Sequence, residues 1–228
     1  MLNIQRCQMT NNELQRTEQW FADRIGKVTA SRLYDVIAKK RTGEYTAARE
    51  VYLNEIILER LTGVSEEVFI NKAMQRGIDY EPKAKEAYML KTMHEIEDVG
   101  FINHPTIPNF GASPDGLILD MFGQPLNKGI EIKCPTRSTH LRTLWKSDIS
   151  PKYLYQMYGQ MMVTGFDSWV FMSYDDRFPT HLRSVIIEVS ITDEIKAEIE
   201  EEVNKFNAEV ADIVEALMNR KEEEIWAA

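Results

Sequence analysis

Two short segments near the middle of the chain hold the residue types best suited to chemistry. They are Ser-Pro-Asp-Gly at 113–116 and Glu-Ile-Lys at 131–133. Alternate residues of a strand share a face, so Glu131 and Lys133 would point the same way, and a hairpin would bring Asp115 beside them. Two carboxylates can hold a divalent cation, and a lysine can orient or deprotonate a water for attack on phosphorus. The spacing therefore predicts metal-assisted hydrolysis.

Each segment alone also has an ordinary explanation. Ser-Pro-Asp-Gly is good turn chemistry, and a glutamate and a lysine two residues apart are common on an exposed strand. The combination at this spacing, with apolar residues around it, is more specific than either part. The pattern by itself still leaves a catalytic site and a chance pairing of two common features open.

The cysteine and histidine content narrows the metals that such a site could hold. The only cysteines are Cys7 and Cys134, too few for an iron–sulfur cluster or a cysteine-bound zinc site. The four histidines lack the spacing of known zinc motifs. Carboxylate oxygens remain as ligands, which favours Mg²⁺, with Mn²⁺ as a substitute.

The charge of the chain is unevenly distributed. The formal net charge is −9, which at first argues against a nucleic-acid partner. Residues 193–224 contain 12 acidic and 4 basic residues, so this segment carries almost all of the excess. The rest is near neutral and leaves room for local basic patches, so net charge does not decide the question.

Neither a membrane span nor a signal peptide is expected. No apolar run approaches the ~18 residues that cross a bilayer, and the first residues are polar, without the apolar core of a signal peptide. We therefore expect a soluble cytoplasmic protein. The 228-residue length fits a single domain over 1–228.

Hydrophobic periodicity predicts helices in the first half and strands in the middle. Pro82 would either kink its helix or start a second one. The helices are expected over 13–24, 29–37, 47–61, 72–93, 141–145 and 151–164, and the strands over 100–103, 110–113, 117–121, 129–134, 169–174 and 182–189. This order indicates an α/β or α+β fold with a central mixed sheet flanked by helices.

A long acidic helix is expected at the end of the chain, over 193–226. Apolar residues recur there at spacings of three and four, and Asp193 and Glu194 suit its first turn. The helix could be a solvated element with one face on the core, or it could dock a partner.

Four motifs in the same order resemble one nuclease family. Pro-Asp followed by Glu-Ile-Lys resembles the signature of the PD-(D/E)xK nucleases, which share a restriction-endonuclease-like core. Three further segments extend the resemblance to lambda-type phage exonucleases, the YqaJ-like viral recombinases: Gly77 to Glu81, Tyr153 to Gln156, and the stretch from Trp20 to Lys40. The similarity runs from about residue 20 to about residue 189.

The resemblance assigns roles to the central residues. It implies that Asp115 and Glu131 bind Mg²⁺ and that Ile132 adds its backbone carbonyl. It implies that Lys133 handles the nucleophilic water. These roles agree with the chemistry that the residue types allow.

The resemblance also assigns roles to three residues of predicted helices. It implies that Glu81 supports the metal and that Gln156 lines the site, although either alone would be read as ordinary helix polarity. Met74 takes the place of an apolar wedge that separates the DNA strands. A buried core methionine is the alternative for Met74.

A pocket for the 5′-phosphate of the shortened strand is implied as well, built from Arg24, Ser31 and Ser113. A guanidinium can donate two hydrogen bonds to phosphate, and hydroxyl groups add short donors. Ser31 could equally be a plain helix cap, and the two roles can coexist.

One family position of the phosphate contact is not matched. The family has an arginine after the Lys-Cys-Pro segment, and Thr139 stands at the aligned place. Arg137 and Arg142 lie nearby in the sequence, and either could substitute.

The resemblance implies 5′-to-3′ digestion of one strand of linear double-stranded DNA, leaving a 3′ single strand. It further implies a ring-shaped homotrimer, a single-strand annealing protein as partner, a role in homologous recombination, and a phage or prophage origin in a bacterial host. Two alternatives stay open. One is an endonuclease or RecB-like repair nuclease on the same core, and the other is a DNA-end-binding protein without catalysis.

Overall fold

A five-stranded mixed sheet runs through the middle of the protein. The computed structural model describes residues 14–65 and 71–220. The strand order is β2-β5-β6-β7-β8, in which β6 and β7 are parallel and the other neighbours antiparallel. The strands are β2 (Glu95–Glu97), β5 (Gly116–Leu119), β6 (Pro125–Lys133), β7 (Ser168–Tyr174) and β8 (Ser184–Ser190). The central mixed sheet predicted from the sequence is confirmed.

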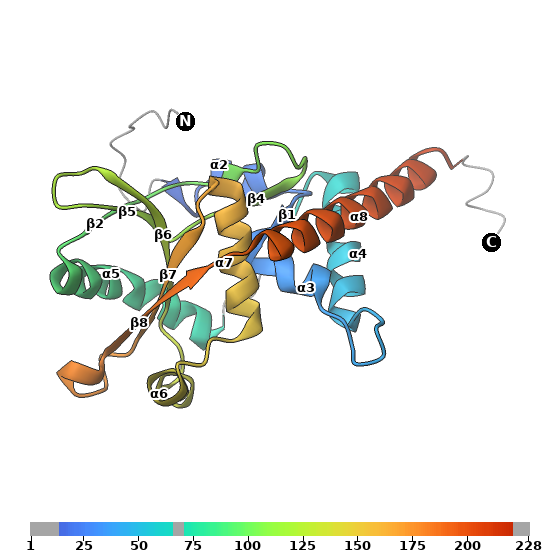
Figure 1. Cartoon of the computed structure of the whole chain (residues 1–228). Coiled ribbons are helices and arrows are strands. Elements are labelled where there is room, and N and C mark those ends of the chain that lie inside the picture. Colours follow the sequence, from blue (N-terminus) through green and yellow to red (C-terminus); the bar gives the residue numbers. More distant parts are fainter. Residues whose placement is uncertain (1–13, 66–70, 221–228) are drawn as a thin grey trace.

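Two helices cover the two faces of this sheet (Figure 1). Along β7, Val170 packs in the same apolar cluster as residues of α5 (Lys72–Thr92), whereas Phe171 packs with residues of α7 (Pro151–Thr164). The alternation continues on β6, where Ile130 and Ile132 join the α5 side. Glu131 therefore faces α7.

The other helices surround these layers. They are α2 (Glu18–Arg24), the short 3₁₀ helix η1 (Ala30–Arg32), α3 (Leu33–Ile37), α4 (Ala47–Thr62), α6 (Arg137–Lys146), the 3₁₀ helix η2 (Thr180–Leu182) and α8 (Asp193–Met218). The helix α4 ends at Gly63, whose φ of 71° suits a left-handed C-terminal residue. None of the helices in the described ranges is both long and apolar enough to cross a bilayer.

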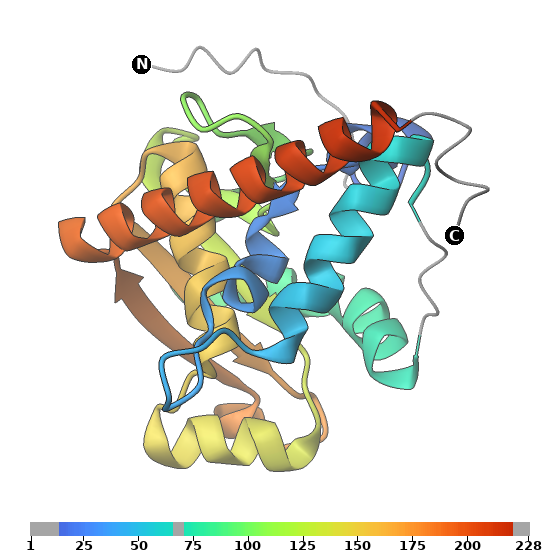
Figure 2. The same ribbon diagram turned by 90° about the vertical axis from the view of Figure 1, so that its right-hand side faces the viewer.

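The long helix α8 crosses α4 and α7, as Figure 2 shows. Val203, Phe206 and Val210 are fully buried on its inner face. Met218 at its end is exposed, and Figure 1 shows this end projecting beyond the body. The predicted helix over 193–226 thus ends at Met218 within the described residues, and 221–226 lie outside them.

A second, three-stranded sheet was not predicted. It has the order β1-β4-β3 and consists of β1 (Val28–Thr29), β4 (Phe110–Ala112) and β3 (Ile102–Asn103). Its strands are two or three residues long, too short for alternation to reveal β1. Parallel pairing of β1 with β4 brings the N-terminal region beside the strand that precedes Ser113.

Several predicted boundaries need correction. One continuous helix, α5, contains Pro82, so of the two alternatives the one in which Pro82 starts a second helix was wrong. The helix α2 begins at Glu18, and residue 13 of the expected helix lies outside the described residues, whereas α6 begins at Arg137, four residues before its predicted start. The start of α6 is polar, and hydrophobic periodicity marks only the apolar part of a helix. Cys7 lies outside the described residues.

Candidate active site

Strand pairing brings Asp115 against the end of β6. Asp115 directly precedes β5, and the register pairs Gly116 with Ile130. One carboxylate oxygen of Asp115, Oδ2, accepts a hydrogen bond from the backbone N–H of Ile132 at 2.7 Å. Burial raises the pKa of Asp115 well above its ordinary value, and the negative charges of Glu131 and Glu81 raise it further. The carboxylates are therefore close enough to repel one another.

Glu131 and Lys133 form an ion pair on the face of β6 that looks toward α7. The pair joins Lys133 Nζ to Glu131 Oε1. Lys133 Nζ also donates to Oε1 of Gln156 at 3.3 Å and lies 4.9 Å from the ring centroid of Tyr153. Burial lowers the pKa of Lys133, but the charges of Glu131 and Asp115 outweigh it and leave this pKa raised. The lysine is therefore held as a cation among acceptors.

A second glutamine of α7, which was not predicted from the sequence, contacts β6. Gln160 Nε2 donates to Glu131 Oε2 at 2.6 Å, and both side chains are buried. Gln160 follows Gln156 by four residues and so lies on the same helix face. That spacing was the available signal.

Glu81 of α5 belongs to a group of charged side chains from three parts of the chain. Lys85 Nζ lies 3.2 Å from Glu81 Oε1 and 2.9 Å from Asp98 Oδ1. Arg16 contacts the other oxygen of Glu81 at 3.8 Å. Burial lowers the pKa of Lys85, but the carboxylates of Glu81 and Asp98 raise it by more. A buried lysine thus holds Glu81 near Asp115, and sequence reasoning did not single it out.

The donor set fits a hard divalent cation. Asp115 and Glu131 offer carboxylate oxygens, and Ile132 offers a backbone carbonyl next to them. In residues 14–65 and 71–220, no three His, Cys, Asp or Glu side chains converge as a ready-made cage. Mg²⁺ is usually held by one or two carboxylates together with waters and substrate phosphates, so a full protein cage is not required.

Arg24 contacts Ser113, which precedes Asp115 by two residues. Arg24 Nη1 donates to Ser113 Oγ at 3.2 Å, and Trp20 Nε1 donates to the same oxygen at 2.9 Å. The guanidinium carbon of Arg24 lies 4.2 Å from the centroid of the Trp20 ring. Burial lowers the pKa of Arg24. Among the described residues no carboxylate forms an ion pair with Arg24, so its charge is available to an anion.

Ser31 lies on η1, which packs tightly against α7. At Gly159 of α7 an added Cβ would lie 2.9 Å from the Cβ of Ala30, so only glycine permits this approach. The Ser31 hydroxyl lies 3.2 Å from that of Thr29. No hydrogen bond joins Ser31 to Arg24 or Ser113 in the described residues, so the structure leaves its expected phosphate role untested.

In the part of the chain that the structure describes, no hydrogen bond or ion pair joins the three α6 residues or Met74 to Arg24 or Ser113. Thr139 contacts the Thr136 hydroxyl at 3.1 Å, and Arg142 pairs with Asp148 at 3.3 Å. Arg137 is exposed. Met74 lies in the first turn of α5 and is 42% exposed, so the alternative of a buried core methionine was wrong.

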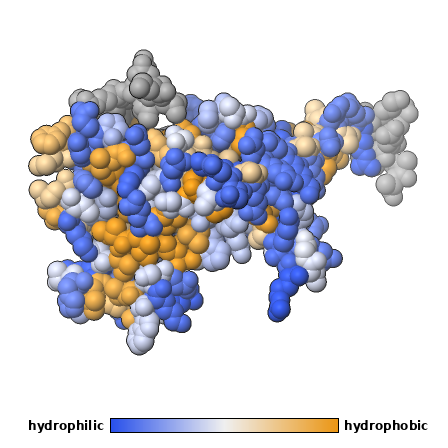
Figure 3. Space-filling model, viewed as in Figure 1, coloured by the Kyte–Doolittle hydropathy of each residue, from blue (hydrophilic) through white to orange (hydrophobic). Residues whose placement is uncertain are grey.

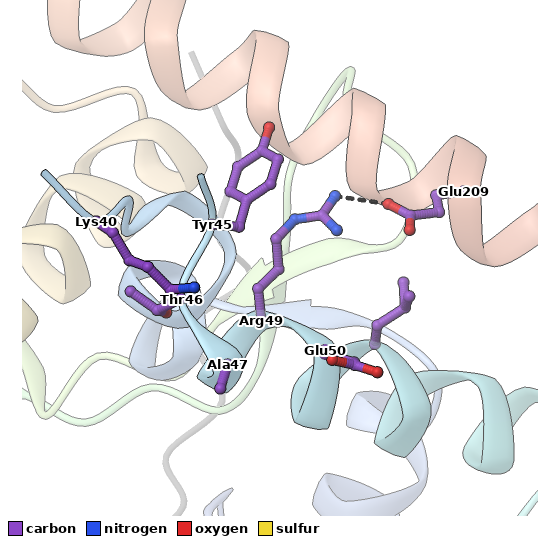
Figure 4. Close-up of a pocket in the computed structure, with 8 residues that line it drawn as sticks. Lys40, Tyr45, Thr46, Ala47, Arg49, Glu50 and Glu209 are labelled. Carbon is purple, nitrogen blue, oxygen red and sulfur yellow. Dashed lines mark ion pairs between the residues drawn. The ribbon is translucent and has the colours of Figure 1, made fainter. Parts of the chain in front are cut away.

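A separate pocket of about 400 Å³ lies between the start of α4 and α8 (Figure 4). It contains none of the expected site residues. Arg49 is buried there and pairs with Glu209 at 2.7 Å, which ties α4 to α8. Lys40 and Glu50 also line the pocket, so its charges are balanced. We assign it a structural role.

Comparison with known proteins finds one family. The sequence model of the YqaJ-like viral recombinase domain matches residues 19–167. No curated protein matches the chain.

Solved structures of exonucleases are similar to this chain. The alkaline exonuclease LHK-Exo from Laribacter hongkongensis is 42% identical, with 93% of this chain and 100% of that chain covered and a TM-score of 0.81. LHK-Exo in complex with dAMP gives the same coverage and TM-score at 43% identity. A phage-related exonuclease from Haemophilus somnus 129PT is 16% identical over 84% of this chain and 96% of that chain, with a TM-score of 0.66, a likeness in fold alone.

Proposed function

This chain belongs to the YqaJ-like viral recombinase family, and from that membership we propose that it is a magnesium-dependent 5′-to-3′ exonuclease. Its substrate is linear double-stranded DNA, from which it removes one strand and leaves a 3′ overhang. The observation that carries the proposal is the meeting of Asp115, Glu131 and Lys133 at the end of β6.

Each residue of the site has a separate role in this proposal. Asp115 and Glu131 would hold the cation, and the Ile132 carbonyl would add an oxygen. When bound, Mg²⁺ supplies positive charge that offsets the charge developing on the phosphate oxygens. Lys133, held by Glu131 and Gln156, directs its ammonium group at the water that attacks phosphorus.

The neighbourhood of Arg24 supports the polarity of the reaction. Ser113 lies two residues before Asp115, so their Cα atoms are at most about 7 Å apart. An anion held by Arg24 and Ser113 therefore sits within roughly one nucleotide of the metal ligands. A 5′-phosphate anchored there would bring the first phosphodiester bond near Asp115 and Glu131. The dAMP bound in a structure of LHK-Exo is a mononucleotide of the kind that such cleavage releases.

The proposal extends to assembly and partners. A ring-shaped homotrimer would enclose the duplex, and a native mass three times that of the chain is the expected measurement. A single-strand annealing protein would take up the 3′ overhang in phage-type homologous recombination. Ser31, the α6 residues Arg137, Thr139 and Arg142, and the wedge Met74 remain proposed DNA contacts.

The test uses one duplex labelled at either end. With Mg²⁺, a 5′-terminal label on linear DNA should be released as a mononucleotide in the first seconds, while a 3′-terminal label on the same strand persists. Closed circular DNA should stay intact. Early release of the 3′ label would reverse the polarity, and cutting of closed circles would make the protein an endonuclease.

A further inference from the structure

Two glutamines one helical turn apart on α7 contact different members of the active site. Gln156 accepts from Lys133 at 3.3 Å, and Gln160 donates to Glu131 at 2.6 Å. Gln160 is 1% exposed and Glu131 is fully buried, so solvent does not replace this hydrogen bond. The contact is short and involves a charged acceptor, which places it among the stronger hydrogen bonds.

The two carboxylate oxygens of Glu131 have different partners. Oε1 pairs with Lys133, and Oε2 accepts from Gln160. The amide orientation of Gln160 is fixed by chemistry, since the reverse orientation would set two acceptors 2.6 Å apart. Gln160 Oε1 has no hydrogen-bond partner among the described residues. The glutamine is therefore oriented by its contact with Glu131.

We propose that Gln160 is a positioning residue that fixes the plane of the Glu131 carboxylate for binding a divalent cation. Without this donor, the carboxylate is free to turn toward Lys133, whose ammonium competes with the cation for the same oxygens. Residues that orient metal ligands change metal affinity or activity by about 10–100-fold when they are removed. The inference rests on the proposed function, because it concerns the cation of that same site.

The direct test measures cation binding without DNA. Mn²⁺ titrations of metal-free protein, followed by electron paramagnetic resonance, would compare wild type with Gln160→Met, which keeps the length and removes the donor. We expect binding about 10–100-fold weaker in the variant. As cation binding weakens, the Mg²⁺ concentration for half-maximal nucleotide release should rise. The affinity for DNA ends, measured without metal, should change little.

A matched control lies one turn further along α7. Thr164→Val removes a buried hydroxyl that donates to the Gln160 carbonyl at 2.8 Å without touching Glu131. It should leave Mn²⁺ affinity within twofold of wild type even if it lowers the melting temperature. If Gln160→Met does not fold, Gln160→Asn keeps the amide but withdraws it by one methylene and should weaken Mn²⁺ binding similarly.

The outcomes separate this inference from the proposed function. If the wild type is an active nuclease and the folded Gln160 variants bind Mn²⁺ as tightly as the wild type, the positioning role alone is overturned. Equal weakening in Thr164→Val would also overturn it, because the effect would then follow from loss of packing in α7. A wild type without Mg²⁺-dependent nuclease activity would instead overturn the proposed function.

Discussion

Arg24 shows at the scale of single residues how the site could recognise one end of a strand. Its guanidinium is held by Ser113 and by the face of Trp20, and no described carboxylate neutralises it. We expect Arg24→Ala to reduce the preference for 5′-phosphorylated over 5′-hydroxyl ends by about 10-fold or more, since a charge-assisted hydrogen bond is lost. Initial digestion rates on the two substrates measure this preference.

Lys27 offers the matched control for Arg24. It lies three residues after Arg24, between α2 and β1, and donates to Asn103 at 2.9 Å without contacting Ser113. Lys27→Ala should keep the phosphate preference. An unchanged preference in Arg24→Ala would remove Arg24 from the phosphate pocket.

The sequence predicted some of these residues and missed others for a physical reason. Glu131 and Lys133 share a face by strand alternation, a local rule that needs no knowledge of the fold. Gln160 and Lys85 gain their importance from burial against Glu131 and Glu81. Their neighbours come from distant parts of the chain. The helix sequence alone therefore does not show which of its polar residues will be buried.

Asp175 joins two elements at the end of the sheet where β6 ends, since Lys133 pairs with Ser173 of the parallel strand β7. It follows β7, is fully buried, and contacts Arg76 of α5 at 3.1 Å and Arg177 at 2.6 Å. Burial raises the pKa of Asp175, but hydrogen bonds from Arg177 and the charge of Arg76 lower it by more. The ion pairs therefore stabilise the attachment of α5 to the sheet.

Asp175→Asn should lower the free energy of unfolding by on the order of 3 kcal/mol near neutral pH, because two arginines lose their buried partner. The depressed pKa means that this contribution is full above the unfolded-state pKa of about 3.9 and is lost as pH falls through the folded-state value. Urea unfolding at several pH values should show the gap between wild type and variant closing below about pH 4.

The control is an exposed pair of the same kind. Asp167 contacts Lys196 at 2.6 Å at the surface, and Asp167→Asn should cost no more than about 1 kcal/mol. A gap for Asp175→Asn that stays constant down to low pH would contradict the role given to its charge.

For the molecule as a whole, the long elements were predictable and the short ones were not. The predicted helix over 151–164 matches α7, and the strand over 169–174 falls within β7, because periodicity over many residues is a strong signal. The strands β1 and β2 exist only through pairing with β4 and β5, which no local pattern reveals.

Charged and apolar side chains are unevenly distributed over the surface. The acidic excess is confined to the C-terminal segment, whose helix α8 projects from the body (Figure 1). Apolar side chains gather on the face seen in Figure 3, over the region of β7 and β8. Contiguous apolar surface of this kind is typical of contacts between chains, in keeping with the proposed homotrimer.

We propose that Asp115 and Lys133 perform metal-dependent hydrolysis, and the release of nucleotides measures this reaction. Wild type, Asp115→Asn and Lys133→Met would be incubated with 5′-phosphorylated linear duplex with and without Mg²⁺, and binding to the same DNA ends would be measured without metal. We predict Mg²⁺-dependent release in wild type, at least about a 100-fold loss in both variants, and end binding within a few-fold of wild type. Full turnover in both variants would contradict the account and place the active site elsewhere.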